Sequence, residues 1–167
     1  MKRKMIFPAL FIAVAAGVFL WWKWRPSEEK RVQQQVERLA ARFSRQSDEG
    51  GAAMALKMNG LSNMFADTFS VNLTDFPFNG EYSSSTMLSN IARARALFEE
   101  ITLRFYDVSV ELTDEDAAEV LFTARVVMKR KAGGAAMADT REMRCALKRV
   151  DGKWLFVSFS EQQVLVP

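Results

Sequence analysis

From Ile101 onward the hydrophobic residues recur at every second position, which is the repeat of a β-strand with one buried face. Short polar segments interrupt this alternation, so consecutive strands are expected to pair in antiparallel fashion. Thr113 to Ala118 and Val150 to Lys153 are predicted hairpin turns, and Ala132 to Asp139 is a predicted hairpin loop. The predicted strands are Ile101 to Leu112, Glu119 to Lys131, Thr140 to Val150 and Lys153 to Val164.

The alternation changes phase once, inside the first of these strands. Its apolar residues stand at odd positions up to Phe105 and at even positions from Val108. Because neighbouring residues of a strand point to opposite faces, a regular strand would send half of this set to the wrong side. One extra residue at Tyr106 and Asp107 restores the phase, so we predict a β-bulge there. A strand buried on both faces is the alternative.

Three helical segments precede the strands. Ser27 is the expected N-cap of the first, which ends at the acidic and glycine-rich stretch Asp48 to Gly51. The second helix spans about Ala52 to Met64. The third begins after Ser84 and Ser85. The apolar period that defines the first helix consists of Val32, Val36, Leu39 and Phe43.

The residues of the third helix that follow the helical period are Met87, Leu88, Ile91, Ala94, Arg95 and Phe98. Before this helix, the alternation from Phe69 to Leu73 predicts a short strand, and the pair Asn79-Gly80 predicts a turn. The order of elements is therefore two helices, a short strand, a third helix and four long strands.

The chain begins with an 18-residue segment without charge, Met5 to Trp22. As a helix it would be about 27 Å long, close to the roughly 30 Å hydrocarbon thickness of a bilayer. A cleaved signal peptide is the alternative, but it would leave an apolar start to the soluble part. We expect residues 1–25 to hold a cytoplasmic stub and a membrane span over about residues 5–22. The residues expected at the membrane interface are Trp21, Trp22, Lys23, Trp24 and Arg25.

The charge distribution predicts that the soluble domain, residues 26–167, lies outside the cytoplasm. Three basic residues precede the apolar segment and two follow it, which favours a cytoplasmic N-terminus. The expected location is the inner membrane as a single-pass protein, with the C-terminal domain in the periplasm or outside. Five of the 23 basic residues precede Pro26, and all 20 acidic residues follow it. The soluble part therefore has slightly more acidic than basic residues. This balance argues against nucleic acid as a partner.

The residue types also limit the chemistry. The chain has no histidine, which excludes catalytic dyads and triads that use one and removes the commonest zinc ligand. The single cysteine, Cys145, cannot form an intramolecular disulfide and is predicted to be an inert core residue. We therefore expect no catalytic residue, no metal and no cofactor.

The third helix running into ITLRFYDVSVEL, and the closing hairpin RVDGKWLFVSF, resemble the nuclear-transport-factor-2-like superfamily, which includes SnoaL-like and ketosteroid-isomerase-like proteins. The resemblance spans most of Val32 to Val164. It implies an α+β fold with three helices packed on a strongly bent antiparallel sheet, a cone with a pocket at its open end. Members range from isomerases and dehydratases to scaffolds, so the resemblance leaves the function open.

The predicted bulge carries the best candidate cluster for a pocket or interaction site, made of Arg104, Tyr106, Asp107 and Arg125. The main hypothesis is a membrane-anchored, outward-facing binding or assembly module without catalysis. Its partners would be the lipid bilayer, other envelope proteins, or a second copy of itself. The alternative is an anchored SnoaL-like enzyme or small apolar-ligand binder with a pocket near Tyr106 and Asp107.

Overall fold

The computed structural model describes residues 26–74, 79–131 and 134–162. The predicted span over residues 5–22 and the expected interface residues Trp21, Trp22, Lys23, Trp24 and Arg25 lie outside these ranges. Among the described helices, none is both long and apolar enough to cross a membrane. The described elements are α2 (Glu28–Phe43), α3 (Gly51–Ser62), β1 (Phe65–Asn72), β2 (Gly80–Ser83), α4 (Ser84–Leu97), β3 (Phe98–Asp114), β4 (Ala117–Arg130), β5 (Ala136–Val150) and β6 (Lys153–Glu161).

The described strands form one sheet in the order β2-β1-β6-β5-β4-β3. The pairs from β3 to β6 are antiparallel, as expected, but β1 runs parallel to β6. The sheet is therefore mixed, and the expectation of a wholly antiparallel sheet is wrong at this pair. The reason is the topology of the chain. α4 connects β2 at one edge of the sheet to β3 at the opposite edge, and the strands from β3 to β6 then run back across the sheet until β6 lies beside β1.

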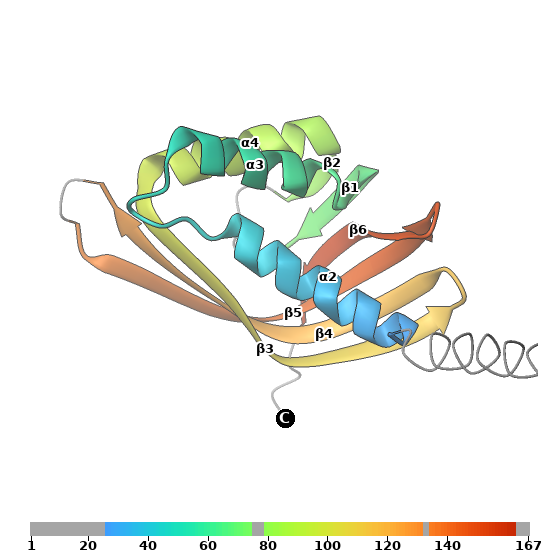
Figure 1. Cartoon of the computed structure of the whole chain (residues 1–167). Coiled ribbons are helices and arrows are strands. Elements are labelled where there is room, and N and C mark those ends of the chain that lie inside the picture. Colours follow the sequence, from blue (N-terminus) through green and yellow to red (C-terminus); the bar gives the residue numbers. More distant parts are fainter. Residues whose placement is uncertain (1–25, 75–78, 132–133, 163–167) are drawn as a thin grey trace, which may run out of the picture.

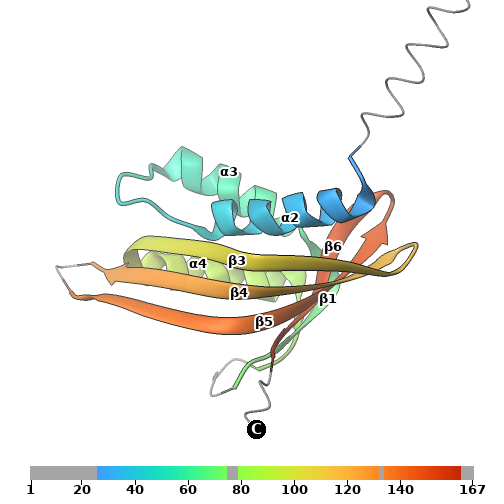
Figure 2. The ribbon, with the colours of Figure 1, turned by 90° about the horizontal axis from the view of Figure 1, so that it is seen from below.

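The sheet curves around the helices, which all lie toward its concave side (Figure 1). In Figure 2 the long strands β3, β4 and β5 are in front and α4 lies behind them. The apolar side of α2 faces the sheet, and Val32 and Val36 are completely buried. They join one core with Leu61 of α3, Ile91 of α4 and Phe156 of β6. This is the α+β arrangement that the order of elements predicts.

The predicted bulge in β3 is confirmed by the strand register. Tyr106 pairs with Thr123 and Ser109 pairs with Leu121, so β3 has one more residue than β4 between these points. Asp107 takes up the excess with a φ of 53°, in the left-handed region that aspartate tolerates better than most residues. The bulge keeps both Phe105 and Val108 packed against the core.

The turn between β5 and β6 is also as predicted. Asp151 and Gly152 both have positive φ, 49° and 74°, which is the conformation of a two-residue type I′ hairpin. This tight turn places Lys153 and Trp154 at the start of β6, beside the beginning of α2. β1 and β2 also pair in antiparallel fashion, but Gly80, predicted to lie in the turn, is the first residue of β2 and pairs with Val71.

The first helix ends earlier than the sequence predicts, at Phe43 rather than at Asp48. Ser44 is extended, and its hydroxyl donates to the Ala40 carbonyl while accepting from the Leu103 N–H at 3.0 Å. Arg45 then forms an isolated bridge with Ile101 of β3. The segment after the helix thus lies against the sheet edge, and it brings Glu49 under α4.

Candidate functional site

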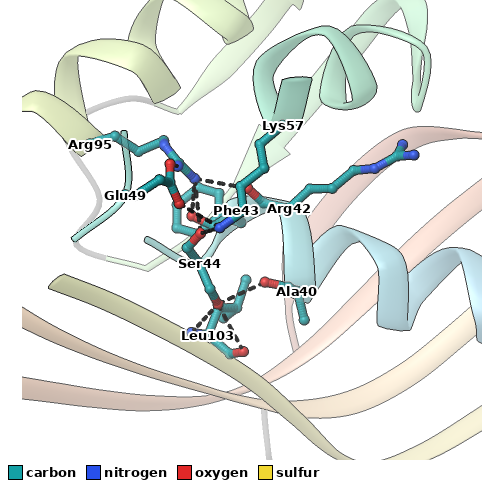
Figure 3. A network of polar contacts seen from close by, with 8 residues as sticks. All are labelled: Ala40, Arg42, Phe43, Ser44, Glu49, Lys57, Arg95 and Leu103. Atoms are coloured by element: carbon teal, nitrogen blue, oxygen red, sulfur yellow. Dashed lines mark hydrogen bonds and ion pairs between the residues drawn. The ribbon is translucent and has the colours of Figure 1, made fainter. Parts of the chain in front are cut away.

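The most buried charge in the described part of the chain is Arg95, whose side chain is fully enclosed. Figure 3 shows its polar contacts. Its Nη1 donates to the carbonyls of Arg42 and Phe43, at 2.8 and 2.6 Å, and more weakly to Ser44. These carbonyls end α2 and have no partner within the helix, so a cation there is favoured by the helix dipole. Arg95 therefore caps α2 from α4, which explains a charged residue at an apolar helical position.

Glu49 completes this network. One carboxylate oxygen accepts from Arg95 Nη2 and the other from Lys57 Nζ. Burial alone would raise the pKa of Glu49, but the hydrogen bond from Lys57 and the charges of Arg95 and Lys57 outweigh it and lower the pKa. A carboxylate held ionised by two cations is a poor general acid, so this network joins α2, α3 and α4 structurally.

A second cluster lies on the concave face of the sheet and is aromatic. Phenylalanine rings from β1, β3, β4 and β6 touch in a continuous row, with centroid separations from 4.5 to 6.4 Å. Most of these rings are buried, whereas Phe105 and Phe159 are only partly buried. The row consists of Phe105, Phe122, Phe159, Phe156, Phe69 and Phe65.

An ion pair continues this face beyond the rings. Arg141 is two residues from buried Met143 on β5, and Glu161 is two residues from Phe159 on β6, so both belong to the concave side. Arg141 Nη1 lies 3.1 Å from Glu161 Oε2. Phe105 pairs with Ala124 across β3 and β4, and Ala124 pairs with Arg141 across β4 and β5. Arg141 therefore lies in the same cross-strand row as the half-buried ring of Phe105.

Both ions are further tied to neighbouring groups. The Thr74 N–H donates to Glu161 Oε2 at 2.7 Å, and Arg141 donates to the Thr74 carbonyl at 2.8 Å and to Asp139. The Thr74 bonds, followed by the charge of Arg141, lower the pKa of Glu161. The hydrogen bond to Asp139 is the largest cause that raises the pKa of Arg141. The pair therefore stays charged at neutral pH.

The four residues that the sequence singled out lie on the opposite, convex face. Arg104, Tyr106 and Arg125 are exposed there, and Arg104 and Arg125 are direct cross-strand neighbours. Asp107 is exposed at the bulge. The structure thus brings all four onto one surface, but away from the aromatic row. Their role as an interaction site stays a prediction.

No protein-family model and no curated protein sequence matches the chain, but solved structures do. A candidate scytalone dehydratase from Novosphingobium aromaticivorans DSM 12444 matches with a TM-score of 0.67 at 10% identity, over 83% of this chain and 85% of that one. A nuclear-transport-factor-2-like superfamily protein from Salmonella enterica serovar Typhimurium LT2 matches with a TM-score of 0.63 at 14% identity, over 80% and 89%. A candidate dehydratase of that family from Streptomyces avermitilis gives 0.62 at 19% identity, over 84% and 98%.

The chain has the nuclear-transport-factor-2-like fold. The resemblance inferred from the closing hairpin and from the third helix is confirmed at the level of the fold. At identities of 10 to 19%, the shared fold leaves the function to be argued from this chain's own residues.

Within the described part of this nuclear-transport-factor-2-like domain, no group of three acidic or cysteine side chains is placed to hold a metal ion. Cys145 is completely buried in the core, and burial raises the pKa of its thiol strongly, so it stays protonated and unreactive. The prediction that Cys145 is a core residue is confirmed.

Sequence reasoning missed both polar clusters of the domain. The position of Arg95 was a usable signal, because an arginine at an apolar helical position implies a buried partner. No comparable signal marks Glu161, which lies 20 residues from Arg141 and meets it only through strand register.

Proposed function

We propose that this domain binds a small, mainly apolar molecule against the concave face of its sheet. The observation that carries the proposal is the aromatic row, whose partly buried members Phe105 and Phe159 lie on the same face as the ion pair of Arg141 and Glu161. Small-molecule sites combine apolar and aromatic walls with a few polar groups that fix orientation. Two proteins named as candidate dehydratases share the fold, which supports a ligand site in it.

The chemistry of this face favours an aromatic ligand with one polar substituent. Rings stack on or meet the edges of phenylalanine side chains, and such contacts contribute about 0.5–1.5 kcal/mol beyond burial. The ion pair offers both a cation and an anion to the substituent. Because Glu161 already accepts hydrogen bonds from Thr74 and Arg141, it is better suited to orient a ligand than to move a proton. Binding, rather than turnover, is the function that these contacts support.

Two leucine substitutions on β4 test this proposal. Ala124 lies opposite Phe105 on the concave face, whereas Thr123 lies opposite Tyr106 on the convex face. Ala124→Leu adds bulk beside Phe105, and Thr123→Leu adds a comparable side chain on the other side of the sheet. With indole as a neutral aromatic probe, Ala124→Leu should weaken binding to the full chain about fivefold or more, which corresponds to about 1 kcal/mol.

The dissociation constant of indole is measured by equilibrium dialysis, and thermal unfolding confirms that both variants fold. Thr123→Leu should bind indole as the unaltered chain does. Equal binding by both variants, or no binding by the unaltered chain, would contradict a site on the concave face.

We also propose that the domain is held outside the cytoplasm at the surface of the inner membrane, with residues 5–22 as the span. The apolar, charge-free run and the basic residues around it support this placement. The start of α2 supports it too. Ser27 caps the helix, because its hydroxyl accepts from the Lys30 N–H at 3.3 Å, so the connection between Arg25 and the helix is very short. Partners in the envelope, or a second copy of the chain, would then meet the domain close to the bilayer.

Extraction and crosslinking of the native membranes test this placement. The chain should stay in the membrane fraction after carbonate washing, and crosslinking followed by mass spectrometry should join it to other envelope proteins or to itself. Release by carbonate would refute the span. The absence of any crosslinked partner, with the span intact, would refute the assembly role alone.

A further inference from the structure

A groove of about 470 Å³ lies between α2, the residues that follow α3, and the β5–β6 turn. This volume is in the range of about 300–1,000 Å³ that small-ligand sites occupy. Four cationic side chains line the groove, and its described lining contains no aspartate or glutamate. The cations are Arg31, Arg38, Arg42 and Lys153.

These four cations differ in how far they are neutralised. Arg31 donates to Glu28 at 2.9 Å, so its charge is balanced locally. Arg42 donates only to the Gly60 carbonyl, at 2.6 Å, and is not paired with a carboxylate among the described residues. The side chains of Arg38 and Lys153 have neither a hydrogen bond nor an ion pair within the described residues. Three positive charges therefore face the groove without a balancing anion.

The fold holds these charges together. Arg31, Arg38 and Arg42 are separated by seven and four residues, which places them along one side of α2. Lys153 follows the rigid type I′ turn at Asp151 and Gly152, and the adjacent Trp154 is fixed to α2 by Gln35, which donates to the Trp154 carbonyl at 2.8 Å. Gln34 adds an uncharged donor to the lining. Such a set of donors suits the oxygens of a phosphate.

The position of the groove suggests where that phosphate comes from. Pro26 is part of the lining and follows Trp22, the last residue of the apolar run, by four positions. Four extended residues reach about 14 Å at most. If residues 5–22 span the membrane, the groove lies within reach of lipid headgroups. Basic clusters next to a span are typical sites for anionic lipids.

We propose that this groove binds the phosphate-bearing headgroup of an anionic phospholipid, and so fixes the domain against the membrane surface. The inference rests on the membrane placement proposed above. It concerns a different set of side chains from the aromatic row, because no phenylalanine is among the residues that line the groove. The headgroup phosphate takes the place of the missing carboxylate between Arg38, Arg42 and Lys153.

Native mass spectrometry of the full chain in a neutral detergent, with added phosphatidylglycerol or phosphatidylcholine, tests the proposal. The unaltered chain should bind phosphatidylglycerol in preference to phosphatidylcholine. Arg38→Gln with Lys153→Gln should lower the affinity for phosphatidylglycerol about 25-fold, at about fivefold for each cation removed. A control with the same change in charge, Arg130→Gln with Lys148→Gln, alters exposed strand residues outside the groove lining and should leave the affinity unchanged.

Three outcomes would overturn the inference: equal affinity of the groove variant and the control, no preference for phosphatidylglycerol, or displacement of phosphatidylglycerol by equimolar inorganic phosphate. The last result would identify a soluble phosphate as the ligand. The detergent measurement does not require a membrane span, so its failure is separate from that of the anchor. Release of the chain by carbonate would refute the anchor, while loss of lipid preference in a carbonate-resistant chain would refute the groove alone.

Discussion

Arg95 is the buried charge of α4, since Arg93 on the same helix is exposed. It caps the last carbonyls of α2 and neutralises Glu49, and both partners would remain buried without it. Removing one member of such a pair leaves an uncompensated charge, which costs far more than the intact pair contributes.

We expect Arg95→Met to lower the free energy of unfolding by about 2–4 kcal/mol, since methionine fills the space but leaves Glu49 and the helix carbonyls unpaired. Arg93→Met is the matched control, because Arg93 is exposed on the same helix. Its effect should stay within about 0.5 kcal/mol. Urea unfolding of the full chain, followed by near-ultraviolet circular dichroism, gives both values. Similar losses in the two variants would show that Arg95 has no special role.

The acid stability of the domain should depend on Glu49. Its pKa is lower in the folded chain than the ordinary value of 4.5, so its contribution to stability is complete above that value and is lost as the pH falls through the folded pKa. The difference in unfolding free energy between the unaltered chain and Glu49→Gln should therefore be constant above about pH 5.5 and shrink below about pH 4.5. A difference that does not change down to about pH 3 would contradict the lowered pKa.

At the scale of elements, the sequence patterns predicted most of what the structure contains. The phase change at Phe105 and Val108 located the bulge, and the Asp151-Gly152 pair located the turn, because both are consequences of local backbone geometry. The end of α2 was missed because Ser44 leaves the helix to bond with Leu103, which is 59 residues away. The parallel pairing of β1 with β6 was missed for the same reason, since a period-two pattern does not encode a distant neighbour.

The bulge gives a test of its own. With a φ of 53°, Asp107 occupies a conformation that costs a β-branched residue about 1–2 kcal/mol, so Asp107→Val should destabilise the domain by about that amount. Asp107→Gly should be neutral or slightly stabilising. Ser109→Val, an exposed change on the same strand, serves as the control. Urea unfolding measures all three, and a Ser109→Val loss equal to that of Asp107→Val would argue against backbone strain.

In the molecule as a whole, the two faces of the sheet carry different candidate functions. The concave face carries the proposed ligand site, and the convex face carries the predicted interaction site. The order of elements was enough to predict the fold, because it follows from local periodicity. The concave site was not predictable, since its aromatic row and ion pair join β1, β3, β4, β5 and β6 through register. The residues that sequence analysis favoured, such as Tyr106, lie on the convex face, where the bulge exposes them.

The most direct test of the central claim is a methyl NMR map of the full chain as indole is added. Binding on the concave face should shift the methyl signals of residues beside Phe105, namely Val126 and Ala124, which alternate with outward residues on β4. The neighbouring convex residues Leu121 and Val127 should keep their signals unchanged. Shifts confined to Leu121 and Val127, or no site-specific shift at all, would contradict a ligand site on the concave face of this domain.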